Sequence, residues 1–426
     1  MTRWFILAAA LLAAPAAAQT VSGCGTTAIS KADASNPAKL ATAADCFGKA
    51  KVIAASAEQT RRDRITAITP APAPAPAPAS APTPVPSPAP KPQPAAVTPI
   101  ASNFPVAPLI GPGAHNPVPS GKPDNVGAFR FICTAGQLNY DDPILYPGVK
   151  GGSPHLHQWY GNLDGNWAST YASLRTSGES TCSNKLNRSA YWVPALMNAA
   201  GKVIVPDYMS IYYKRLPDGD PQCLKESAKG CVGLPTGLRI VSGYDMKRMG
   251  QPQPENATYT HRCITDGKPQ IERATLAEAI ADCGGAGQIM SAVNFGACWN
   301  GDLDSADHRS HVTQAKYVGE AYPQCPADHP YLIPQLRQQL AYTITAGDGD
   351  VWFSSDRMNG MTMPGGSTFH ADYMEAWDPA TRATWENRCI GQLLNCSDGE
   401  LGDGTMLKRG PLTYSAVQRL IDAPTR

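Results

Sequence analysis

The fold class is indicated most clearly by one segment, which reads Val203-Ile204-Val205-Pro206-Asp207-Tyr208-Met209-Ser210-Ile211-Tyr212-Tyr213-Lys214-Arg215. β-Branched and aromatic residues dominate this segment, and such residues favour strands over helices. Other segments have the same character and are bounded by Gly, Pro, Asn or Asp: Phe129–Cys133, Tyr191–Met197, Leu238–Tyr244, Thr258–Ile264, Gln288–Trp299, His311–Tyr317, Leu340–Ala346 and Val351–Ser354. So many short strands with turn signals predict an all-β dominated fold, with a β-sandwich or jelly-roll-like core stabilised by disulfides.

The composition agrees with a chain that turns often. Of the 426 residues, 38 are Gly and 40 are Pro, while charged residues make up only 17%. These proportions point to many turns and few long surface helices. We therefore expect only a few short helices, at Ala274–Asp282, Pro379–Leu394 and Thr413–Ile421.

The net charge excludes one class of partner. The 36 Lys and Arg residues nearly balance the 35 Asp and Glu residues, which leaves a formal charge of +1. Such a chain has no global field that would recruit a polyanion. We therefore expect no nucleic-acid partner, and the sequence leaves the oligomeric state open.

The N-terminus has the pattern of a secretory signal peptide. A basic start at Met1–Arg3 precedes an apolar run from Trp4 to Ala14, and Ala16–Ala18 forms a small-residue cleavage site. We expect residues 1–18 to be removed, so that the mature chain begins at Gln19. A membrane anchor is the alternative, but it needs about 20 apolar residues and Pro15 interrupts this run. The pattern predicts a secreted or periplasmic protein with no integral membrane segment after cleavage.

The rest of the chain divides into three parts. Residues 19–69 form a small Ala-rich helical segment, and residues 70–101 form a Pro/Ala-rich linker of extended character. Residues 102–426 hold the β-rich segments and all eight histidines. We therefore expect the folded domain and its chemistry in this last part.

The twelve cysteines indicate disulfides. An even number suits an exported chain, and the absence of any Cys-x-x-Cys pair disfavours a zinc site built from cysteines. Connectivity does not follow from sequence alone, but proximity along the chain suggests this set: Cys24–Cys46, Cys133–Cys182, Cys223–Cys231, Cys263–Cys283, Cys298–Cys325 and Cys389–Cys396.

Histidines and carboxylates gather in three segments of the β-rich part. The candidate catalytic residues are His155, His157, His308, His311, His370 and Asp372. The candidate substrate-binding residues are Asp142, Trp159, Tyr160, Asp304, Asp307 and Arg309. His155 and His157 are two apart, so on a strand they would share one face and could share a metal ion. The candidate metal ligands are His155, His157, His311 and His370.

These segments, with several aromatic motifs, carry a resemblance to a known family. The motifs are Asp142-Pro143-Ile144, Ser153-x-His155-x-His157, Tyr191-Trp192-Val193-Pro194-Ala195-Leu196, Tyr212-Tyr213, Cys298-Trp299-Asn300-Gly301, Asp307-His308-x-Ser310-His311, Cys325-Pro326 and His370-x-Asp372. In their order and spacing the chain resembles the domain of unknown function 1996 family of secreted fungal and bacterial proteins, over about 129–377. It departs from the family pattern at Ala371, where the family more often has Gly, and at Pro154. The resemblance implies architecture and export, and implies no activity.

Two kinds of function fit these residues. In the first, the protein acts on an extracellular or envelope polysaccharide through a His/Asp-lined pocket, as a hydrolase or a lyase. Either a divalent metal ion activates water there, or a histidine acts as general acid or base without a metal. In the second, the protein is a non-catalytic carbohydrate- or cell-wall-binding module.

Structural roles compete with each assignment. His155 and His157 could be hydrogen-bonded sheet residues, and Asp304, Asp307 and His308 could cap a turn. Tyr191 and Trp192 could stack against sugars, but on strands such residues more often belong to the core. An enzyme should gather its His and Asp residues in one place, whereas a binding module should present a strip of surface aromatics.

Overall fold

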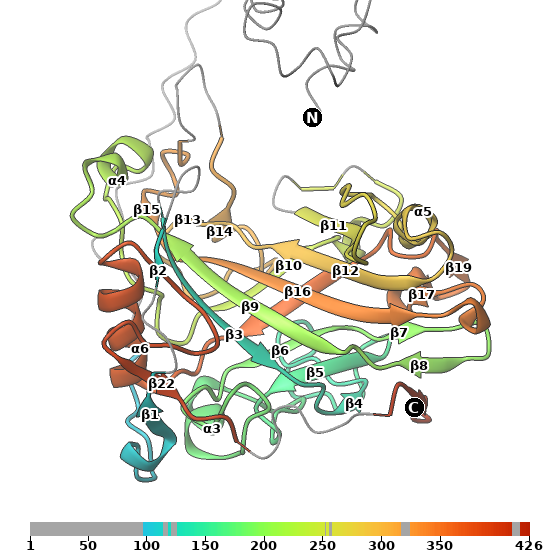
Figure 1. Cartoon of the computed structure of the whole chain (residues 1–426), viewed down its shortest axis with the longest axis horizontal. Helices are drawn as coiled ribbons and strands as arrows, with labels where there is room; N and C mark the ends of the chain where they lie inside the picture. The colour runs from blue at the N-terminus through green and yellow to red at the C-terminus, as the bar shows by residue number, and fades with distance from the viewer. Residues whose placement is uncertain are drawn as a thin grey trace, which may run out of the picture. The chain divides into compact units, whose positions relative to one another are not determined.

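Two β-sheets packed face to face form the body of the protein in the computed structural model (Figure 1). The structure describes residues 97–113, 118–120, 126–251, 253–254, 258–316, 324–410 and 418–426. The predicted signal peptide, the helical segment 19–69, most of the linker and the Cys24–Cys46 pair lie outside these residues and stay predictions.

The larger sheet has seven strands and lies nearer the viewer in Figure 1. Its order is β11 (Thr258–Cys263), β12 (Gly287–Asn294), β16 (Gln335–Ile344), β9 (Tyr208–Arg215), β3 (Gly127–Cys133), β21 (Leu394–Cys396) and β2 (Val118–Pro119). Its long central strands are antiparallel neighbours. Strand β9 comes from the segment that decided the fold class, and its Met209, Ile211 and Tyr213 are buried while Tyr212 is half-buried.

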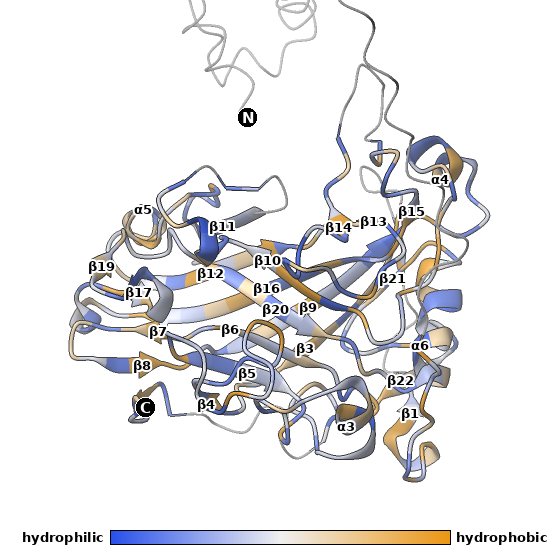
Figure 2. Cartoon of the chain, turned by 180° about the vertical axis from the view of Figure 1, so that it is seen from behind, coloured by the Kyte–Doolittle hydropathy of each residue, from blue (hydrophilic) through white to orange (hydrophobic). Residues whose placement is uncertain are grey.

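The second sheet has five strands and lies nearer the viewer in Figure 2, which shows the molecule from behind. Its order is β10 (Arg239–Gly243), β20 (His370–Met374), β6 (Ala190–Pro194), β5 (His157–Gly161) and β4 (Leu138–Asn139). The strands β10, β20, β6 and β5 pair antiparallel with their neighbours. Because side chains alternate along a strand, this sheet has one face toward the larger sheet and one face away from it.

The main core fills the space between the two sheets. It combines Phe131 and Ile211 of the larger sheet with Tyr160, Tyr191 and Tyr373 of the smaller one. A second apolar cluster, which includes Trp159, Trp192 and Met374, lies on the opposite face of the five-stranded sheet. Both faces of this sheet are therefore covered, and polar residues on its outer face are buried as well.

Shorter strands complete the sheet structure. They are β1 (Ile110–Pro112) with β22 (Thr405–Leu407); β13 (Cys298–Trp299) with β14 (Val312–Thr313) and β15 (Tyr331–Leu332); β17 (Trp352–Phe353), β7 (Leu196–Met197), β8 (Lys202–Ile204) and β23 (Leu420–Asp422); and β18 (Arg357–Met358) with β19 (Met361–Thr362). The predicted all-β, disulfide-stabilised fold is confirmed, and each predicted strand segment contains a strand of the structure.

The helices are short, as expected, but their bounds differ from the prediction. They are α3 (Tyr171–Thr176), α4 (Pro221–Glu226), α5 (Leu276–Asp282) and α6 (Pro379–Trp385), with a π-helical turn at Glu386–Ile390 and single 3-10 turns at Ala107–Leu109, Met246–Arg248, Ala346–Asp348 and Ser354–Asp356. Helix α5 begins after Thr275, whose hydroxyl caps the N–H of Glu278. The α3 and α4 helices were not predicted.

Two predicted helices need correction. The helix expected at Pro379–Leu394 ends earlier, because the chain turns after Ile390 and enters β21, which pairs with β3. The helix expected at Thr413–Ile421 is wrong at its end, where Leu420–Asp422 forms a strand paired with β8. Residues 413–417 lie outside the described part of the chain. In both cases pairing with a distant strand overrides the local helical pattern.

Five disulfides join the ten cysteines of the β-rich part. Each pair matches the prediction: Cys133–Cys182, Cys223–Cys231, Cys263–Cys283, Cys298–Cys325 and Cys389–Cys396. Such a set fits an oxidising compartment. Among the described residues, no helix has both the length and the apolar character needed to cross a bilayer.

Candidate metal centre

The outer face of the five-stranded sheet places two histidines in one row. His370 on β20 lies opposite Gly243 of β10, and His157 on β5 lies opposite Pro194 of β6. Strand β6 lies between β20 and β5, so the two histidine backbones are about 9.6 Å apart, or two strand spacings. Gly243 has φ of 86°, and a Cβ there would lie only 2.6 Å from the Cα of His370, so a glycine is required at this position.

The loop before β5 brings a third histidine into the gap between these two. His155 precedes the strand, where the chain bends, and Ser153 holds it in place. The Ser153 hydroxyl donates to the His155 carbonyl oxygen at 2.9 Å, and the Ser153 N–H donates to the carbonyl oxygen of Tyr140 at 2.8 Å. The loop therefore folds back over the sheet and presents His155 to the other two rings.

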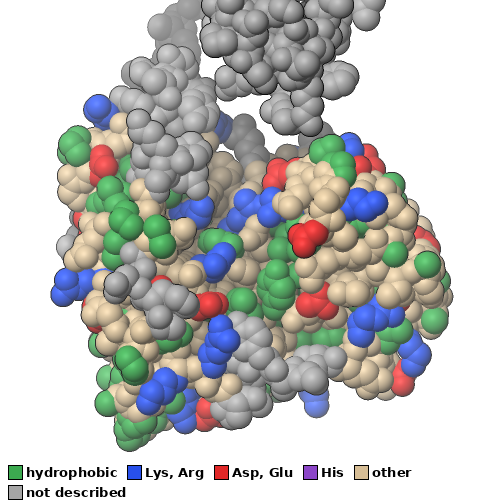
Figure 3. Space-filling model, viewed as in Figure 1, with side chains coloured by type: hydrophobic (Ala, Val, Ile, Leu, Met, Phe, Trp, Pro, Cys, Tyr) green, Lys and Arg blue, Asp and Glu red, His purple; other side chains and the backbone are tan. Residues whose placement is uncertain are grey.

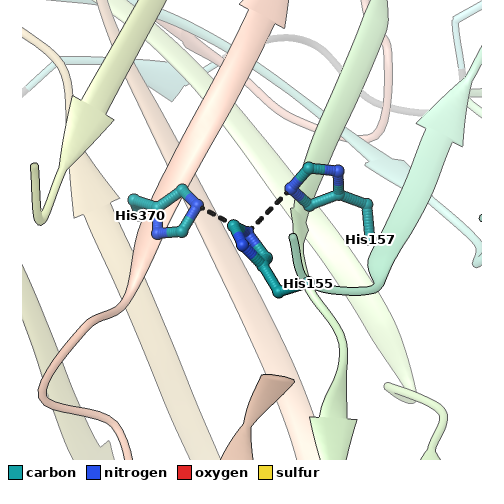
Figure 4. A group of neighbouring side chains, drawn as sticks. All are labelled: His155, His157 and His370. Carbon is teal, nitrogen blue, oxygen red and sulfur yellow. Dashed lines mark hydrogen bonds between the residues drawn. The ribbon is translucent and has the colours of Figure 1, made fainter. Parts of the chain in front are cut away.

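The three rings meet at their Nε2 atoms, as Figure 4 shows. Nε2 of His155 lies 2.9 Å from Nε2 of His157 and 3.2 Å from Nε2 of His370. The rings are nearly perpendicular, with angles of 84° between His155 and His157 and 89° between His155 and His370. We call His155, His157 and His370 the three-histidine centre.

Backbone carbonyls fix which nitrogen carries the hydrogen in two of the rings. Nδ1 of His370 lies 2.8 Å from the carbonyl oxygen of Thr368, and Nδ1 of His157 lies 3.0 Å from that of Asp141. A carbonyl oxygen only accepts hydrogen bonds, so both Nδ1 atoms donate. In a neutral ring the lone pair is then on Nε2. Two lone pairs therefore face Nε2 of His155.

The three Nε2 atoms cannot all be satisfied by hydrogen bonds to one another. Nε2 of His155 carries at most one hydrogen, which can satisfy only one of the two lone pairs. A metal cation among the three Nε2 atoms would satisfy all of them. Zn–N distances of about 2.0–2.1 Å in a tetrahedral site place two ligand nitrogens about 3.3 Å apart, close to the distances found here. Carbonyl partners on Nδ1 are also the usual supports of metal-binding histidines.

Burial keeps all three rings neutral, which is the form that binds metals. His155 is 5% exposed, His157 0% and His370 1%. Burial lowers the pKa of each ring; for His370 it is lowered to about 3, and for His155 the neighbouring rings lower it further. Nδ1 of His155 has no hydrogen-bond partner among the described residues.

Two buried carboxyl groups accompany the centre. Burial raises the pKa of Asp142, although the neighbouring His157 opposes the rise, and Oδ1 of Asp142 accepts from the N–H groups of Ile144 and Leu145. Asp372 shares the outer face of β20 with His370. Burial raises the pKa of Asp372 well above its usual value, and the charge of Asp142 raises it further. Neither carboxyl oxygen of Asp372 has a hydrogen-bond partner among the described residues.

The comparison with protein families assigns the chain. A model described as domain of unknown function (DUF1996) matches residues 142–377. The chain belongs to the DUF1996 family. The match confirms the resemblance found in the sequence, and it encloses the three-histidine centre together with Asp142 and Asp372. No curated protein and no solved structure matches the chain.

Two more predicted residues of this DUF1996 domain lie beside the centre. The His308 imidazole opposes the rise in the pKa of Asp142, and its Nδ1 lies 2.8 Å from Oδ1 of Asp304. Asp304 also pairs with Arg239 at 2.6 Å. Arg309 is 5% exposed, and its charge lowers the pKa of Asp372. Both Nη atoms of Arg309 donate to the carbonyl oxygens of Gly243 and Tyr244 at 2.9 Å.

His311 and Asp307 stand apart from the histidine centre. Nε2 of His311 lies 2.7 Å from the carbonyl oxygen of Arg239, and its Nδ1 lies 2.9 Å from the hydroxyl of Ser305. Both ring nitrogens are therefore occupied, and His311 is not in the group that could hold a metal ion. Partial burial would raise the pKa of Asp307, but hydrogen bonds from the Ser310 and Arg309 N–H groups and from two hydroxyls hold it below its usual value. Asp307 thus caps a turn.

The aromatic residues expected to bind substrate belong to the core, which corrects that expectation. Trp159 and Tyr160 are both 0% exposed, and Trp159 stacks on Trp192 with 4.4 Å between ring centroids. Tyr191 and Trp192 are also fully buried. The strand propensity of Tyr191 and Trp192 already pointed to the core, and a buried ring offers no surface to a sugar.

The sequence did not reveal the groups that orient the histidines. These are the carbonyl oxygens of Asp141 and Thr368, which any residue could supply, and the side chain of Asp356. Asp356 accepts from the N–H and hydroxyl of Thr368 at 2.9 and 2.6 Å, and from the N–H of Gly366 at 2.7 Å. It thereby holds the turn whose carbonyl orients His370.

Proposed function

We propose that this protein binds a divalent transition-metal ion at the three-histidine centre and uses it to act on a polysaccharide outside the cytoplasm. The observation that carries the proposal is the pair of Nε2 lone pairs, on His157 and His370, that converge on Nε2 of His155. Three neutral imidazoles are ligands that zinc, copper, nickel and iron all accept.

Three protein ligands leave a coordination position for water in a tetrahedral site. A bound metal ion lowers the pKa of such a water molecule to near 7 and thus supplies a nucleophile at neutral pH. Asp372 lies two residues from His370 on the same strand face, and its carboxyl oxygens have no partner among the described residues. In this proposal the Asp372 carboxyl group exchanges a proton with a reacting group at the centre. Hydrolysis of a glycosidic bond is the reaction class that we assign to this arrangement.

The choice of a polysaccharide rests on where the chain is expected to act. A signal peptide, a proline-rich linker and a disulfide-rich domain are typical of proteins outside the cytoplasm, where envelope and extracellular glycans are the abundant polymers. The five disulfides support this location.

One observation favours a second function. The three histidines are almost completely buried, which suits a metal ion that stabilises the fold and never meets a substrate. In that case the protein would be a non-catalytic carbohydrate- or wall-binding module with a structural metal site. The two functions share the metal ion and differ in whether water and substrate reach it.

Metal analysis of the purified mature chain tests the site itself. We expect one equivalent of a transition metal in the wild type, and less than a tenth of an equivalent after His155→Ala, His157→Ala or His370→Ala. His329→Gln is the matched control, because His329 is also largely buried and contacts Asp328 and the carbonyl oxygen of Ser310. Wild-type protein that stays metal-free after incubation with zinc, copper, nickel and iron salts would refute the metal site.

Cobalt substitution separates the two functions. A catalytic centre with an open position should change its visible spectrum when azide is added, whereas a closed structural site should not. The same preparations are then incubated with neutral and acidic polysaccharides, and new reducing ends are measured. Azide binding together with metal-dependent release of reducing ends supports the enzyme. A fixed spectrum with no product supports the binding module.

A further inference from the structure

A second polar surface lies on the other side of the sandwich, on the outer face of the seven-stranded sheet. Side chains that alternate with buried core residues point away from the core. They are Arg130 and Ile132 on β3 and Tyr208, Tyr212 and Lys214 on β9. Arg337 on β16 and Arg262 on β11 also point away from the core. Figure 3 views this side and shows Lys and Arg side chains down the middle of the face. We call Arg130, Tyr208, Tyr212, Lys214, Arg262 and Arg337 the basic sheet face.

The strand register brings three of these residues into one row. Arg130 pairs with Tyr212, and Tyr212 pairs with Arg337, so one tyrosine lies between two arginines on neighbouring strands. The Tyr212 ring organises the cations around it. The Arg130 guanidinium lies 5.4 Å from the centre of that ring and its Nη1 donates to the Tyr212 hydroxyl at 2.9 Å, while Nζ of Lys214 lies 5.8 Å from the ring centre.

Arg262 on the edge strand β11 and Arg337 on β16 form a second pair of cations, and both are half-buried. The Arg337 side chain is 28% exposed. Burial lowers the pKa of Arg337, and the positive charge of Arg262 lowers it further. In the strand register Arg262 lies in the row of Tyr208 and Arg337 in the row of Tyr212, four residues apart on the same face.

Within the described part of the chain, no acid forms an ion pair with Arg130 or Arg262. Among the described residues, the acid that pairs with Arg337 is Glu272, at 3.7 Å and with a side chain that is 53% exposed. Nε of Arg262 is buried and has no hydrogen-bond partner among the described residues. A buried N–H group of an arginine without an acceptor is costly. An anion bound to the guanidinium groups of Arg262 and Arg337 would offset the positive charge that gathers on this face.

We propose that the basic sheet face binds an acidic polysaccharide, with the carboxylates of successive uronic acid residues lying against Arg130, Arg262 and Arg337. Guanidinium groups bind carboxylates through paired hydrogen bonds, and a flat sheet face suits an extended polymer. A polymer with one carboxylate per sugar would meet the cations along the face in turn.

The small number of cations favours this ligand over nucleic acid. With a formal charge of +1 the chain has no global field for a polyanion, so an acidic polymer would be held by this local patch alone. Four cations on one face are also fewer than the six to ten phosphate contacts that are typical of strong DNA binding. The choice of a glycan rests on the proposed function, but the surface is separate from the three-histidine centre and is tested separately.

Binding to polygalacturonate, a linear polymer of uronic acids, tests the proposal. Wild-type mature protein should bind it at low ionic strength and should bind its methyl ester, in which the charges are removed, at least tenfold more weakly. The variant with Arg130→Gln, Arg262→Gln and Arg337→Gln should lose at least tenfold in affinity for polygalacturonate. The control removes the same charge from exposed lysines elsewhere, by Lys150→Gln, Lys229→Gln and Lys247→Gln, and should bind as the wild type does.

The circular dichroism spectrum and metal content of the triple arginine variant show whether it folds as the wild type does. If it does not, single Arg262→Lys and Arg337→Lys variants, which keep the charge but not the paired hydrogen bonds, replace it and should each weaken binding at least threefold. Three results would each overturn the proposal. The triple Lys→Gln control could lose as much affinity as the triple Arg→Gln variant, the arginine variants could bind polygalacturonate as the wild type does, or the wild type could bind double-stranded DNA more tightly than polygalacturonate. Unchanged polymer binding by His155→Ala would show that the basic sheet face works without the metal centre, so this proposal stands even if the proposed function fails.

Discussion

At the scale of single residues, Asp372 is the side chain whose position is hardest to explain by stability. It is 1% exposed, and neither carboxyl oxygen has a hydrogen-bond partner among the described residues. Replacing such a group by an apolar side chain of similar shape is expected to stabilise a fold. We therefore expect Asp372→Leu to raise the free energy of unfolding of the metal-free protein by about 1–3 kcal/mol. The same change should abolish any metal-dependent activity.

Urea unfolding of wild type and variant measures this effect. Asp378→Leu is the matched control, because Asp378 is equally buried but accepts from Thr381 at 2.9 and 2.8 Å and from Ser102 at 2.8 Å. That substitution should lower the free energy of unfolding. A loss of stability in Asp372→Leu as large as in Asp378→Leu would mean that Asp372 has a structural role.

The buried His261 leads to a prediction about how stability depends on pH, and this prediction does not involve the metal centre. Burial lowers the pKa of His261 to about 4, whereas an unfolded histidine has a pKa of about 6.5. Between these values the unfolded chain binds more protons than the folded one, so the stability that His261 contributes is complete above pH 6.5. It is lost as the pH falls toward 4, by about 3 kcal/mol in total. Urea unfolding of wild type and His261→Gln between pH 7 and pH 4 should show a steeper fall for the wild type; parallel curves would contradict it.

At the scale of elements, the turn before β20 determines how well His370 is oriented. Asp356 accepts from Thr368 and Gly366, and the Thr368 carbonyl in turn accepts from Nδ1 of His370. Outer groups of this kind typically contribute 10- to 100-fold to metal affinity. We expect Asp356→Ala to weaken zinc binding at least tenfold, measured by competition with a chelator. Thr368→Val, which removes only one of these hydrogen bonds, should have a smaller effect, and equal affinities in all three proteins would contradict this role.

The elements also show what could be predicted from the sequence. Strand segments such as Tyr208–Arg215 were predictable because alternation of apolar and polar residues and β-branched side chains act locally. The convergence of His155 and His157 was predicted from their spacing, although His155 lies before the strand. The helical interpretation of Thr413–Ile421 was wrong at Leu420 and Ile421, because pairing with β8 is a contact between distant segments.

The candidate site was only partly predictable for a similar reason. His370 lies more than two hundred residues from His155, and only the sheet order places β20 and β5 on either side of β6. From the sequence alone, Trp159 and Tyr160 could belong either to a sugar-binding surface or to a core. A sugar-binding surface is excluded only because both faces of the five-stranded sheet are covered. The orienting carbonyls of Asp141 and Thr368 carry no signal in the side-chain sequence.

At the scale of the whole molecule, the Cys133–Cys182 disulfide and the metal centre restrain overlapping parts of the chain. The disulfide closes a segment with a sequence separation of 49 residues, and this segment contains His155, His157 and Asp142. Loop-closure entropy predicts a loss of about 4 kcal/mol when the bond is removed by Cys133→Ala with Cys182→Ala. A metal ion shared by His155, His157 and His370 is a second cross-link, because it ties the same segment to β20.

Metal should therefore stabilise the protein, and the double cysteine variant should depend on it most. With free metal at about 1,000 times its Kd, binding to the folded state alone adds about 4 kcal/mol. Thermal unfolding with zinc and with a chelator measures the effect in the wild type, in the double cysteine variant and in each after His370→Ala. We expect zinc to restore most of the stability that the missing disulfide costs, and to restore nothing once His370 is replaced. If zinc raises the Tm equally with and without His370, the ion binds elsewhere, and the three-histidine centre is then a hydrogen-bonded group within the fold.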